Sequence, residues 1–308
     1  MILVSFGGPE RTEDVIPFLE NVLRGRNVPR ARMLEVAEHY YLLGGRSPIN
    51  DQCRELIAAL RQVIDLPIYW GNRNWHPLLP GTLRQMQQDG VRRAVAIATS
   101  AYSSYSGCRQ YLENIAAACP DGLVVDKLPP FSAHPKFIEA TADRVQAALD
   151  RAPQARLVYT GHSIPLSMAA TSRYEQEIRD TARRVSQLVS HDEWDIAWQS
   201  RSGPPSQPWL EPDILSHLRA LAWSGVKDVV VAPIGFLSDH MEVLYDLDHE
   251  AAALARELGI NFVRAQTVGT HPALIAMLKE LIEERLNADA PSVCPEDCCP
   301  PAPAIRPR

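Results

Sequence analysis

The sequence predicts an α/β fold with two similar lobes, each a parallel sheet of four strands flanked by helices. Short β-branched or apolar runs alternate with longer stretches of helical period, which is the signature of βαβ units. Four candidate strands fall in each half of the chain. Its length of 308 residues exceeds the usual size of one domain, and a hydrophobic content of 46% is ordinary for a globular protein.

The elements follow in order from the local composition and period of each stretch. The predicted strands are the apolar runs at 1–6, 67–71, 93–99, 122–126, 155–160, 194–199, 227–234 and 260–265. The predicted helices are the stretches at 12–24, 48–64, 106–118, 135–151, 167–187, 212–223, 241–257 and 271–286. Because Met1 lies inside the first strand without a polar lead-in, we expect the natural start to lie a few residues upstream.

The division between the lobes is predicted at Leu128–Phe131, where two prolines interrupt both patterns. This places one lobe at 1–127 and the other at 128–268, and leaves 269–308 as a last helix and a tail. The last 22 residues, from Asn287, contain six prolines and three cysteines and show no apolar period. Such a tail cannot bury enough surface to fold alone, so it needs an external tie.

Charge and hydropathy exclude several classes of function. The formal net charge of −6 and the pI near 5.9 argue against a nucleic-acid partner, because a phosphate-binding face carries a basic excess. No apolar run approaches the ~18 residues of a membrane span. The N-terminus lacks the basic start and apolar stretch of a signal peptide. We therefore expect a cytoplasmic protein without membrane insertion.

Two short polar runs follow predicted strands and carry most of the functional signal. Gly161–Pro165 follows the strand at 155–160, and Ser238–Glu242 follows the strand at 227–234. In open α/β sheets, ligands bind at the carboxyl ends of strands. His162 and Glu242 are therefore predicted to converge on one site, although about eighty residues separate them.

Five sequence blocks together resemble the ferrochelatase family from residue 1 to about 286. They are Phe6–Glu10, Gly44–Asn50, Ser200–Pro204 before Pro208–Leu210, Ser238–Tyr245, and the Gly161–Pro165 run itself. The blocks occur in the family's order and at its approximate spacing. The resemblance implies the type II chelatase fold, with two Rossmann-like lobes and a last helix that crosses back onto the first lobe.

The implied activity is insertion of Fe²⁺ into a porphyrin, which requires that the ion lose its water and that two pyrrole N–H protons leave. Histidine can accept a proton at neutral pH and can also ligate a borderline metal. In the family, the residue matching His162 is essential and the carboxylate matching Glu242 faces it. A histidine at a strand end could alternatively be a hydrogen-bonded packing residue.

Further carboxylates follow Glu242 at a spacing of four residues. On a helix, Asp246 and Glu250 share its face, and in the family such a stripe serves as a metal or proton path, sometimes on a locally widened turn. A solvated outer face is an equal alternative, because Leu244, Leu247, Ala251 and Leu254 supply a buried stripe. Asp239 or Ser238 is expected to cap this helix, with His240 in a supporting role.

A porphyrin also needs cationic or hydroxyl partners for its carboxylates, and apolar walls. The candidate contacts are Tyr40, Arg46, Ser47, Arg24, Arg26 and Trp209, of which Trp209 resembles the family's aromatic wall but could equally anchor a loop. Phe6 stands where relatives carry a tyrosine or a methionine that can approach the metal. Because a phenyl ring cannot ligate, that axial contact is absent here.

The cysteines give a second signal. Cys294, Cys298 and Cys299 lie within six residues of the tail, and stable disulfides are disfavoured in the cytoplasm, which favours metal ligation. Cys108 sits where cluster-bearing ferrochelatases supply a fourth thiolate. Four thiolates suit zinc or a 2Fe-2S cluster, and the resemblance implies the cluster. A merely redox-sensitive tail is the alternative. Cys53 and Cys119, within predicted helices, are expected to be buried apolar residues.

The resemblance also implies the substrate. A membrane-facing insertion of the mammalian type is missing between Glu10 and Tyr40. The blocks at Ser5–Glu10 and Tyr105–Gln110 are similar to those of actinobacterial relatives, whose substrate is coproporphyrin III. Protoporphyrin IX is the alternative substrate. A cobalt or nickel chelatase for a sirohydrochlorin-like ring and a non-catalytic haem carrier are the rival functions. The protein is expected to be a monomer that contacts neighbouring haem-pathway enzymes transiently.

Overall fold

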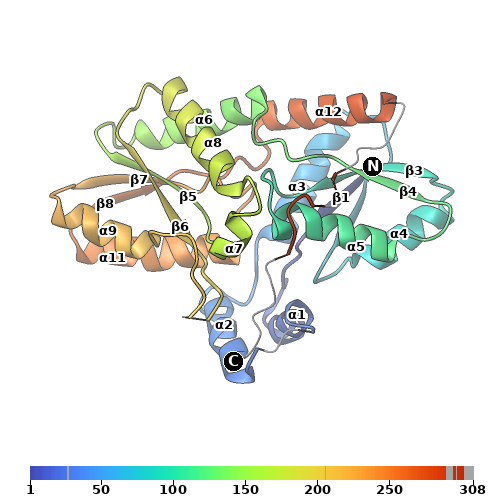
Figure 1. Cartoon of the computed structure of the whole chain (residues 1–308), viewed down its shortest axis with the longest axis horizontal. Coiled ribbons are helices and arrows are strands. Elements are labelled where there is room, and N and C mark those ends of the chain that lie inside the picture. The colour runs from blue at the N-terminus through green and yellow to red at the C-terminus, as the bar shows by residue number, and fades with distance from the viewer. Residues whose placement is uncertain (26–27, 205, 289–293, 296, 302–308) are drawn as a thin grey trace.

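The computed structural model describes residues 1–25, 28–204, 206–288, 294–295 and 297–301, and contains two parallel four-stranded sheets (Figure 1). The first lobe holds the sheet β2-β1-β3-β4, formed by β1 (Ile2–Ser5), β2 (Tyr69–Asn72), β3 (Arg93–Ala98) and β4 (Val124–Lys127). The second lobe holds the sheet β6-β5-β7-β8, formed by β5 (Arg156–His162), β6 (Trp194–Gln199), β7 (Asp228–Ala232) and β8 (Asn261–Arg264). The predicted α/β class with two parallel sheets is confirmed, and the sheets share one strand order.

Helices cover the faces of both sheets, which is why the middle residues of the central strands are apolar and buried. The first lobe contains η1 (Thr12–Asp14), α1 (Val15–Val22), α2 (Arg30–Leu42), α3 (Ile49–Arg61), α4 (Leu79–Gln88), the π-helical turn η2 (Tyr105–Arg109) and α5 (Gln110–Ala118). The second lobe contains α6 (Pro135–Leu149), α7 (Leu166–Ala169), α8 (Tyr174–Leu188), α9 (Ile214–Trp223), α10 (Met241–Val243), the π-helix η3 (Leu244–Ala251) and α11 (Ala252–Glu257). The last helix is α12 (Pro272–Asn287).

Three helical features differ from the predicted ranges. Helices α2 and α4 lie outside them: α2 buries only Met33 and Ala37, so its apolar period is weak, and α4 begins with Pro80 and Gly81 in its first turn. The helix predicted at 167–187 is divided into α7 and α8 by the turn at 170–173. The predicted strands match the observed strands closely because local composition determines them.

Helix α12 contacts both lobes, as the resemblance implies. Lys136 at the start of α6 forms an ion pair with Glu280 of α12, and Arg285 of α12 forms an ion pair with the buried Asp126 of β4. Arg93 of β3 also donates a hydrogen bond to the carbonyl of Ala288 (3.2 Å). Figure 1 shows α12 running along one edge of the molecule beside α3. These contacts hold the end of the chain across the junction between the lobes.

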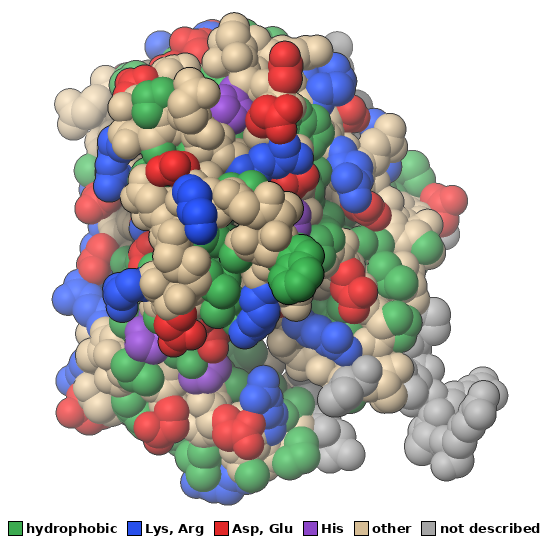
Figure 2. Space-filling model, turned by 90° about the vertical axis from the view of Figure 1, so that its left-hand side faces the viewer, with side chains coloured by type: hydrophobic (Ala, Val, Ile, Leu, Met, Phe, Trp, Pro, Cys, Tyr) green, Lys and Arg blue, Asp and Glu red, His purple; other side chains and the backbone are tan. Residues whose placement is uncertain are grey.

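The face of the second lobe in Figure 2 intermixes acidic and basic side chains, without a continuous area of positive charge. None of the helices in the described part of the chain combines the length and apolar content needed to cross a bilayer.

Candidate active site and cysteine site

His162 is the last residue of β5, the longest strand of the second sheet. Leu157 to Thr160 are fully buried, and β5 continues past β7 so that His162 pairs in register with Gln199 of β6. The strand therefore carries the imidazole to the carboxyl edge of the sheet, where its side chain remains about one third exposed. The strand-end position predicted for His162 is thus the observed one.

The two ring nitrogens of His162 have different partners. Nδ1 lies 2.5 Å from the backbone carbonyl of Ser163, and a carbonyl oxygen can only accept a hydrogen bond. In the neutral ring Nδ1 therefore carries the proton, and Nε2 keeps its lone pair. Nε2 lies 3.6 Å from Oε2 of Glu242. An uncharged His162 thus presents a free lone pair toward a half-exposed carboxylate.

His240, expected in a supporting role, caps the helix that carries Glu242. Its Nδ1 accepts the backbone N–H of Glu242 (3.2 Å), so His240 is the N-cap of α10, rather than the predicted Asp239 or Ser238. Asp239 instead accepts two hydrogen bonds from Arg264 (3.1 Å each). Burial lowers the pKa of His240, against the opposing charge of Glu242. A neutral His240 is required, because only an unprotonated nitrogen can accept this bond.

The acidic stripe lies on the α10 and η3 segment and is not a simple solvated face. Asp246 accepts hydrogen bonds from the Ser200 hydroxyl and from Gln199 Nε2 (3.3 Å), both at the end of β6. Burial raises the pKa of Asp246 to about 7; the hydrogen bond from Ser200 opposes this rise and the charge of Glu242 adds to it. Burial also raises the pKa of Glu250, as does the charge of Asp213.

Helix α2 of the first lobe reaches this segment of the second lobe. The rings of His39 and Tyr245 stack with centroids 3.8 Å apart and planes 5° apart. Burial raises the pKa of Tyr40 above its usual range, and the charge of Glu242 adds to this rise. The site therefore forms where α2 meets α10 and η3. The sequence carried no signal for this contact, because α2 was not among the predicted helices.

The other predicted porphyrin contacts have varied surroundings. Arg46 is exposed and forms an ion pair with Asp51, and Arg24 is exposed and bonds the side chain of Asn21. Ser47 is buried, with its side chain against Gly8. Arg26 lies outside the described residues. Among the described members of this group, Tyr40 is the residue whose pKa is raised by the charge of Glu242.

Trp209 is buried in the loop between β6 and α9, which pairs with the segment that follows β5. It forms a bridge with Pro165, and the neighbouring Leu210 donates its N–H to Ile164 (3.0 Å). Its indole nitrogen has no hydrogen-bond partner among the described residues. Phe6 follows β1 and is partly exposed, with Arg73 over its ring at 5.7 Å. Both aromatic rings therefore lie close to strand ends, on opposite lobes.

The tail cysteines lie against the turn that holds Cys108. Arg109 donates one hydrogen bond to the carbonyl of Cys298 and one to the carbonyl of Pro295 (3.0 Å each). Cys108 is buried in η2, and the sulfur atoms of Cys298 and Cys299 are 3.8 Å apart. The described tail residues thus have the external tie that their composition requires.

Electrostatics connects all four of these thiols. Burial raises the pKa of Cys294, and the charges of Cys108 and Cys298 add to this rise. Burial likewise raises the pKa of Cys299 to about 12, again with contributions from Cys298 and Cys108. Burial and neighbouring charge therefore oppose the thiolate form of Cys294 and Cys299. As placed, no three His, Cys, Asp or Glu side chains within the described ranges converge as a metal site.

The two remaining cysteines are separate from this group. Cys53 is buried in α3, and burial raises the pKa of its thiol to about 11. Cys119 is only partly buried and follows α5 rather than lying within it, because α5 ends at Ala118. Its Sγ donates to the carbonyl of Leu123 (3.1 Å).

Comparison with known proteins gives a consistent result. A family model described as ferrochelatase matches residues 1–286. A ferrochelatase of Rhodopirellula baltica is 51% identical over 323 residues, covering 97% of this chain and 92% of the relative. A coproporphyrin III ferrochelatase of Nocardia farcinica is 49% identical over 313 residues, covering 94% and 89%.

Solved structures with this fold are more distant in sequence. SirB from Bacillus subtilis with Fe³⁺ superposes with a TM-score of 0.60 at 12% identity, covering 92% of this chain and 93% of that chain. CbiX, described as the terminal enzyme of sirohaem biosynthesis in denitrifying bacteria, has a TM-score of 0.55 at 15% identity, covering 92% and 97%. These likenesses establish the chelatase fold and nothing about the substrate.

Proposed function

Because this chain belongs to the ferrochelatase family, whose members insert metal into a porphyrin, we propose that it inserts Fe²⁺ into coproporphyrin III to form coproheme. The placement of His162 against Glu242, at the carboxyl edge of the second sheet, is the observation that carries the proposed mechanism. Relatives named coproporphyrin III ferrochelatase, at 46% to 49% identity, support this substrate.

His162 and Glu242 would divide the chemistry of insertion. The Nε2 lone pair of His162 can accept a pyrrole proton or coordinate the incoming iron. The carboxylate of Glu242 opposite it can replace part of the iron's water shell. His240 would hold Glu242 in place through the capping hydrogen bond, so that both groups approach the macrocycle from one side.

Asp246 and Glu250 would extend this site into a path for protons or metal. A carboxyl with a pKa of about 7 can both release and accept a proton at neutral pH. The hydrogen bonds from Gln199 and Ser200 hold Asp246 one helical turn from Glu242. Protons taken from the porphyrin could therefore leave along the π-helix.

Coproporphyrin III carries four propionates, so its site needs polar groups around more of the rim than protoporphyrin IX does. We propose Tyr40, Arg46, Ser47, Arg24, Arg26 and Trp209 as the rim and wall contacts. Tyr40 is supported best, because the charge of Glu242 contributes to the raised pKa of its hydroxyl. Arg46 would have to exchange Asp51 for a propionate, which its exposure permits.

Cys108, Cys294, Cys298 and Cys299 would hold a 2Fe-2S cluster. The approach of the tail to the Cys108 turn, held by the two hydrogen bonds that Arg109 donates to tail carbonyls, supports this proposal. A bound cluster would supply one-electron chemistry and a covalent tie between the tail and the first lobe.

We also propose that the chain divides into domains after residues 127 and 268. This division keeps each four-stranded sheet within one domain.

A visible absorption spectrum of the freshly purified protein, with iron and sulfide assays, is the first test. Steady-state assays with ferrous iron should then compare coproporphyrin III with protoporphyrin IX. One propionate contact left unmatched implies on the order of tenfold discrimination. Equal or better turnover of protoporphyrin IX would overturn the substrate, and retained haem without turnover would indicate a carrier instead.

A further inference from the structure

One helix of the second lobe contacts the loop that leads to Cys108 in the first lobe. The carboxylate of Glu177, on α8, accepts two hydrogen bonds from Ser103: Oε2 from its N–H and Oε1 from its hydroxyl, both at 2.7 Å. The hydroxyl of the next residue, Ser104, accepts the N–H of Gly107 (2.9 Å) and so caps the turn that carries Cys108. Glu177 therefore anchors the Cys108 turn to the opposite lobe.

The same helix contacts the backbone of the proposed catalytic histidine. Tyr174, at the first position of α8, donates its hydroxyl hydrogen to the carbonyl of His162 (3.0 Å). The fit is close, because a Cβ on Gly161 would lie 3.1 Å from the hydroxyl oxygen of Tyr174. Tyr174 and Glu177 are three residues apart, so they lie on neighbouring positions of one helix face.

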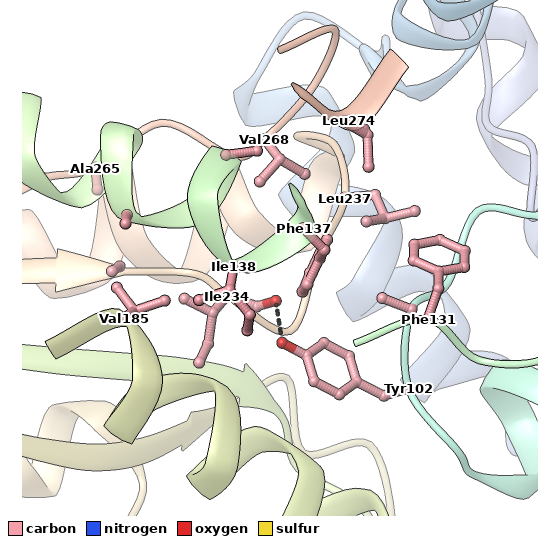
Figure 3. Packing of buried hydrophobic residues seen from close by; sticks show 14 of the residues in the cluster. Tyr102, Phe131, Phe137, Ile138, Val185, Ile234, Leu237, Ala265, Val268 and Leu274 are labelled. Atoms are coloured by element: carbon pink, nitrogen blue, oxygen red, sulfur yellow. Dashed lines mark hydrogen bonds between the residues drawn. The ribbon is translucent and has the colours of Figure 1, made fainter. Parts of the chain in front are cut away.

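Tyr102, in the same loop before Cys108, forms a second connection to the end of β5 through the hydrophobic core. The hydroxyl of Tyr102 donates to the carbonyl of Ile234 (3.0 Å), as Figure 3 shows, and its ring packs edge-on against Tyr174. The residue after Ile234, Gly235, donates its N–H to the carbonyl of Thr160 (3.0 Å). The loop before Cys108 is thus connected with the end of β5 at two points.

Glu177 also influences a tail cysteine through its charge. Its charge is among the smaller influences that raise the pKa of Cys299, after burial and the neighbouring thiols. Arg109 holds the carbonyls of the tail from the other side of the Cys108 turn. Glu177 therefore lies on the helix that touches His162 and bonds the loop that leads to Cys108.

We infer that Glu177 is a positioning residue that couples the cysteine site to His162. A metal or cluster held by the thiols would restrict the motion of the turn at 103–109. Through its hydrogen bonds to Ser103, Glu177 would then restrict the motion of α8 and of the His162 backbone that Tyr174 contacts. This inference rests on the proposed role of His162 in insertion. It assigns the cysteine site a structural influence on catalysis that needs no electron transfer.

Three variants of the full-length protein test the inference. Glu177→Ala removes both acceptors. Glu177→Gln keeps one acceptor for the Ser103 N–H and an amide that can pair with the Ser103 hydroxyl. Glu175→Ala is the matched control, because Glu175 lies on the same helix and forms an exposed ion pair with Arg179 (2.7 Å).

We expect Glu177→Ala to lower kcat on the order of tenfold to a hundredfold with little change in the KM for porphyrin, because small misplacements of a reacting group have effects of this size. Hydrogen exchange should become faster both at 103–109 and at 160–165. Glu177→Gln should retain most of the wild-type kcat and exchange, and Glu175→Ala should resemble the wild type. If Glu177→Ala loosens only 103–109 and leaves kcat unchanged, the residue is merely structural and the inference fails.

A double-mutant comparison separates the coupling from independent effects at the Cys108 turn and at the His162 segment. Cys108→Ser should accelerate exchange at 160–165 in the wild-type background but add little in Glu177→Ala. Full additivity would overturn the inference, and so would a Glu177→Gln variant as impaired as Glu177→Ala. If Glu177→Ala does not fold, Ser103→Ala replaces it, because this change removes only the hydroxyl donor. Absence of iron insertion by the wild type would refute the proposed function, whereas the exchange data would still report on the coupling.

Discussion

The Nε2 atom of His162 lies 3.6 Å from Oε2 of Glu242, although the two residues belong to different strand ends of the second sheet. His162 ends β5 directly, whereas Glu242 follows β7 through a loop and a capping histidine. Because β5 and β7 are parallel neighbours, their carboxyl ends lie at one edge, and the two side chains meet there.

Replacing His162 by alanine should lower kcat by at least 10²- to 10⁴-fold, because the acceptor of the pyrrole proton is lost. Porphyrin binding should persist, since the ring is held by other groups. Absorbance titration and steady-state kinetics measure the two effects separately. His134→Asn is the control, because His134 only caps α6. Wild-type turnover in His162→Ala would refute the assignment.

Glu242→Gln should preserve the volume and the fold but lose the charge that attracts iron. We expect an increased KM for Fe²⁺ and a kcat reduced by roughly a hundredfold. Glu283→Gln on α12, an exposed residue paired with Lys279, should change neither constant. Unchanged iron dependence in Glu242→Gln would show that another group receives the metal.

The raised pKa of Asp246 predicts that the free energy of unfolding decreases as the pH rises. Its pKa is about 7 in the folded protein and near 3.8 in the unfolded chain, so between these values the unfolded state binds fewer protons. Stability contributed at Asp246 therefore falls as the pH rises from about 4 to about 7, and is constant above. Asp246→Asn should remove this slope and gain at most about 4 kcal/mol above pH 7.

Urea denaturation at about pH 5 and about pH 8 measures this difference. Asp65→Asn is the control, because Asp65 is exposed. A stability difference between Asp246→Asn and the wild type that does not change with pH would contradict the raised pKa.

Gly235→Ala should displace the end of β5. The new Cβ would lie 2.6 Å from the Cα of Gly161, next to His162, and backbone atoms cannot yield locally. Overpacking of this kind costs about 1 to 3 kcal/mol. We expect a loss of kcat larger than the loss of stability accounts for. Gly81→Ala in α4, where nothing lies within 4 Å, should be neutral in both assays.

Cys108→Ser, or the same change at any of the three tail cysteines, should abolish bound iron and sulfide and lower the melting temperature. A ligand held only by the native state contributes directly to its stability. Cys119→Ser should leave both unchanged, because that thiol lies outside the group and only donates to a carbonyl. Two irons per chain in Cys108→Ser would place the fourth ligand elsewhere.

The sequence by itself determined the eight strands, most helices and the positions of His162 and Glu242. The central strands contain continuous buried runs, such as Leu157–Thr160, and residues that follow such runs in a parallel sheet meet at one edge. The buried runs and the polar residues that follow them are both short segments of the chain. They can therefore be recognised without knowing how the lobes dock.

Only the tertiary structure decided how the lobes meet around that site. The stacking of His39 on Tyr245, the cap from His240 and the contact of Glu177 with Ser103 depend on helices whose own periods do not reveal their partners. Helix α2 buries only two residues within its lobe, so its sequence resembles an exposed segment. The physical reason is that these contacts join residues far apart in the chain, and burial of both lobes against each other positions them.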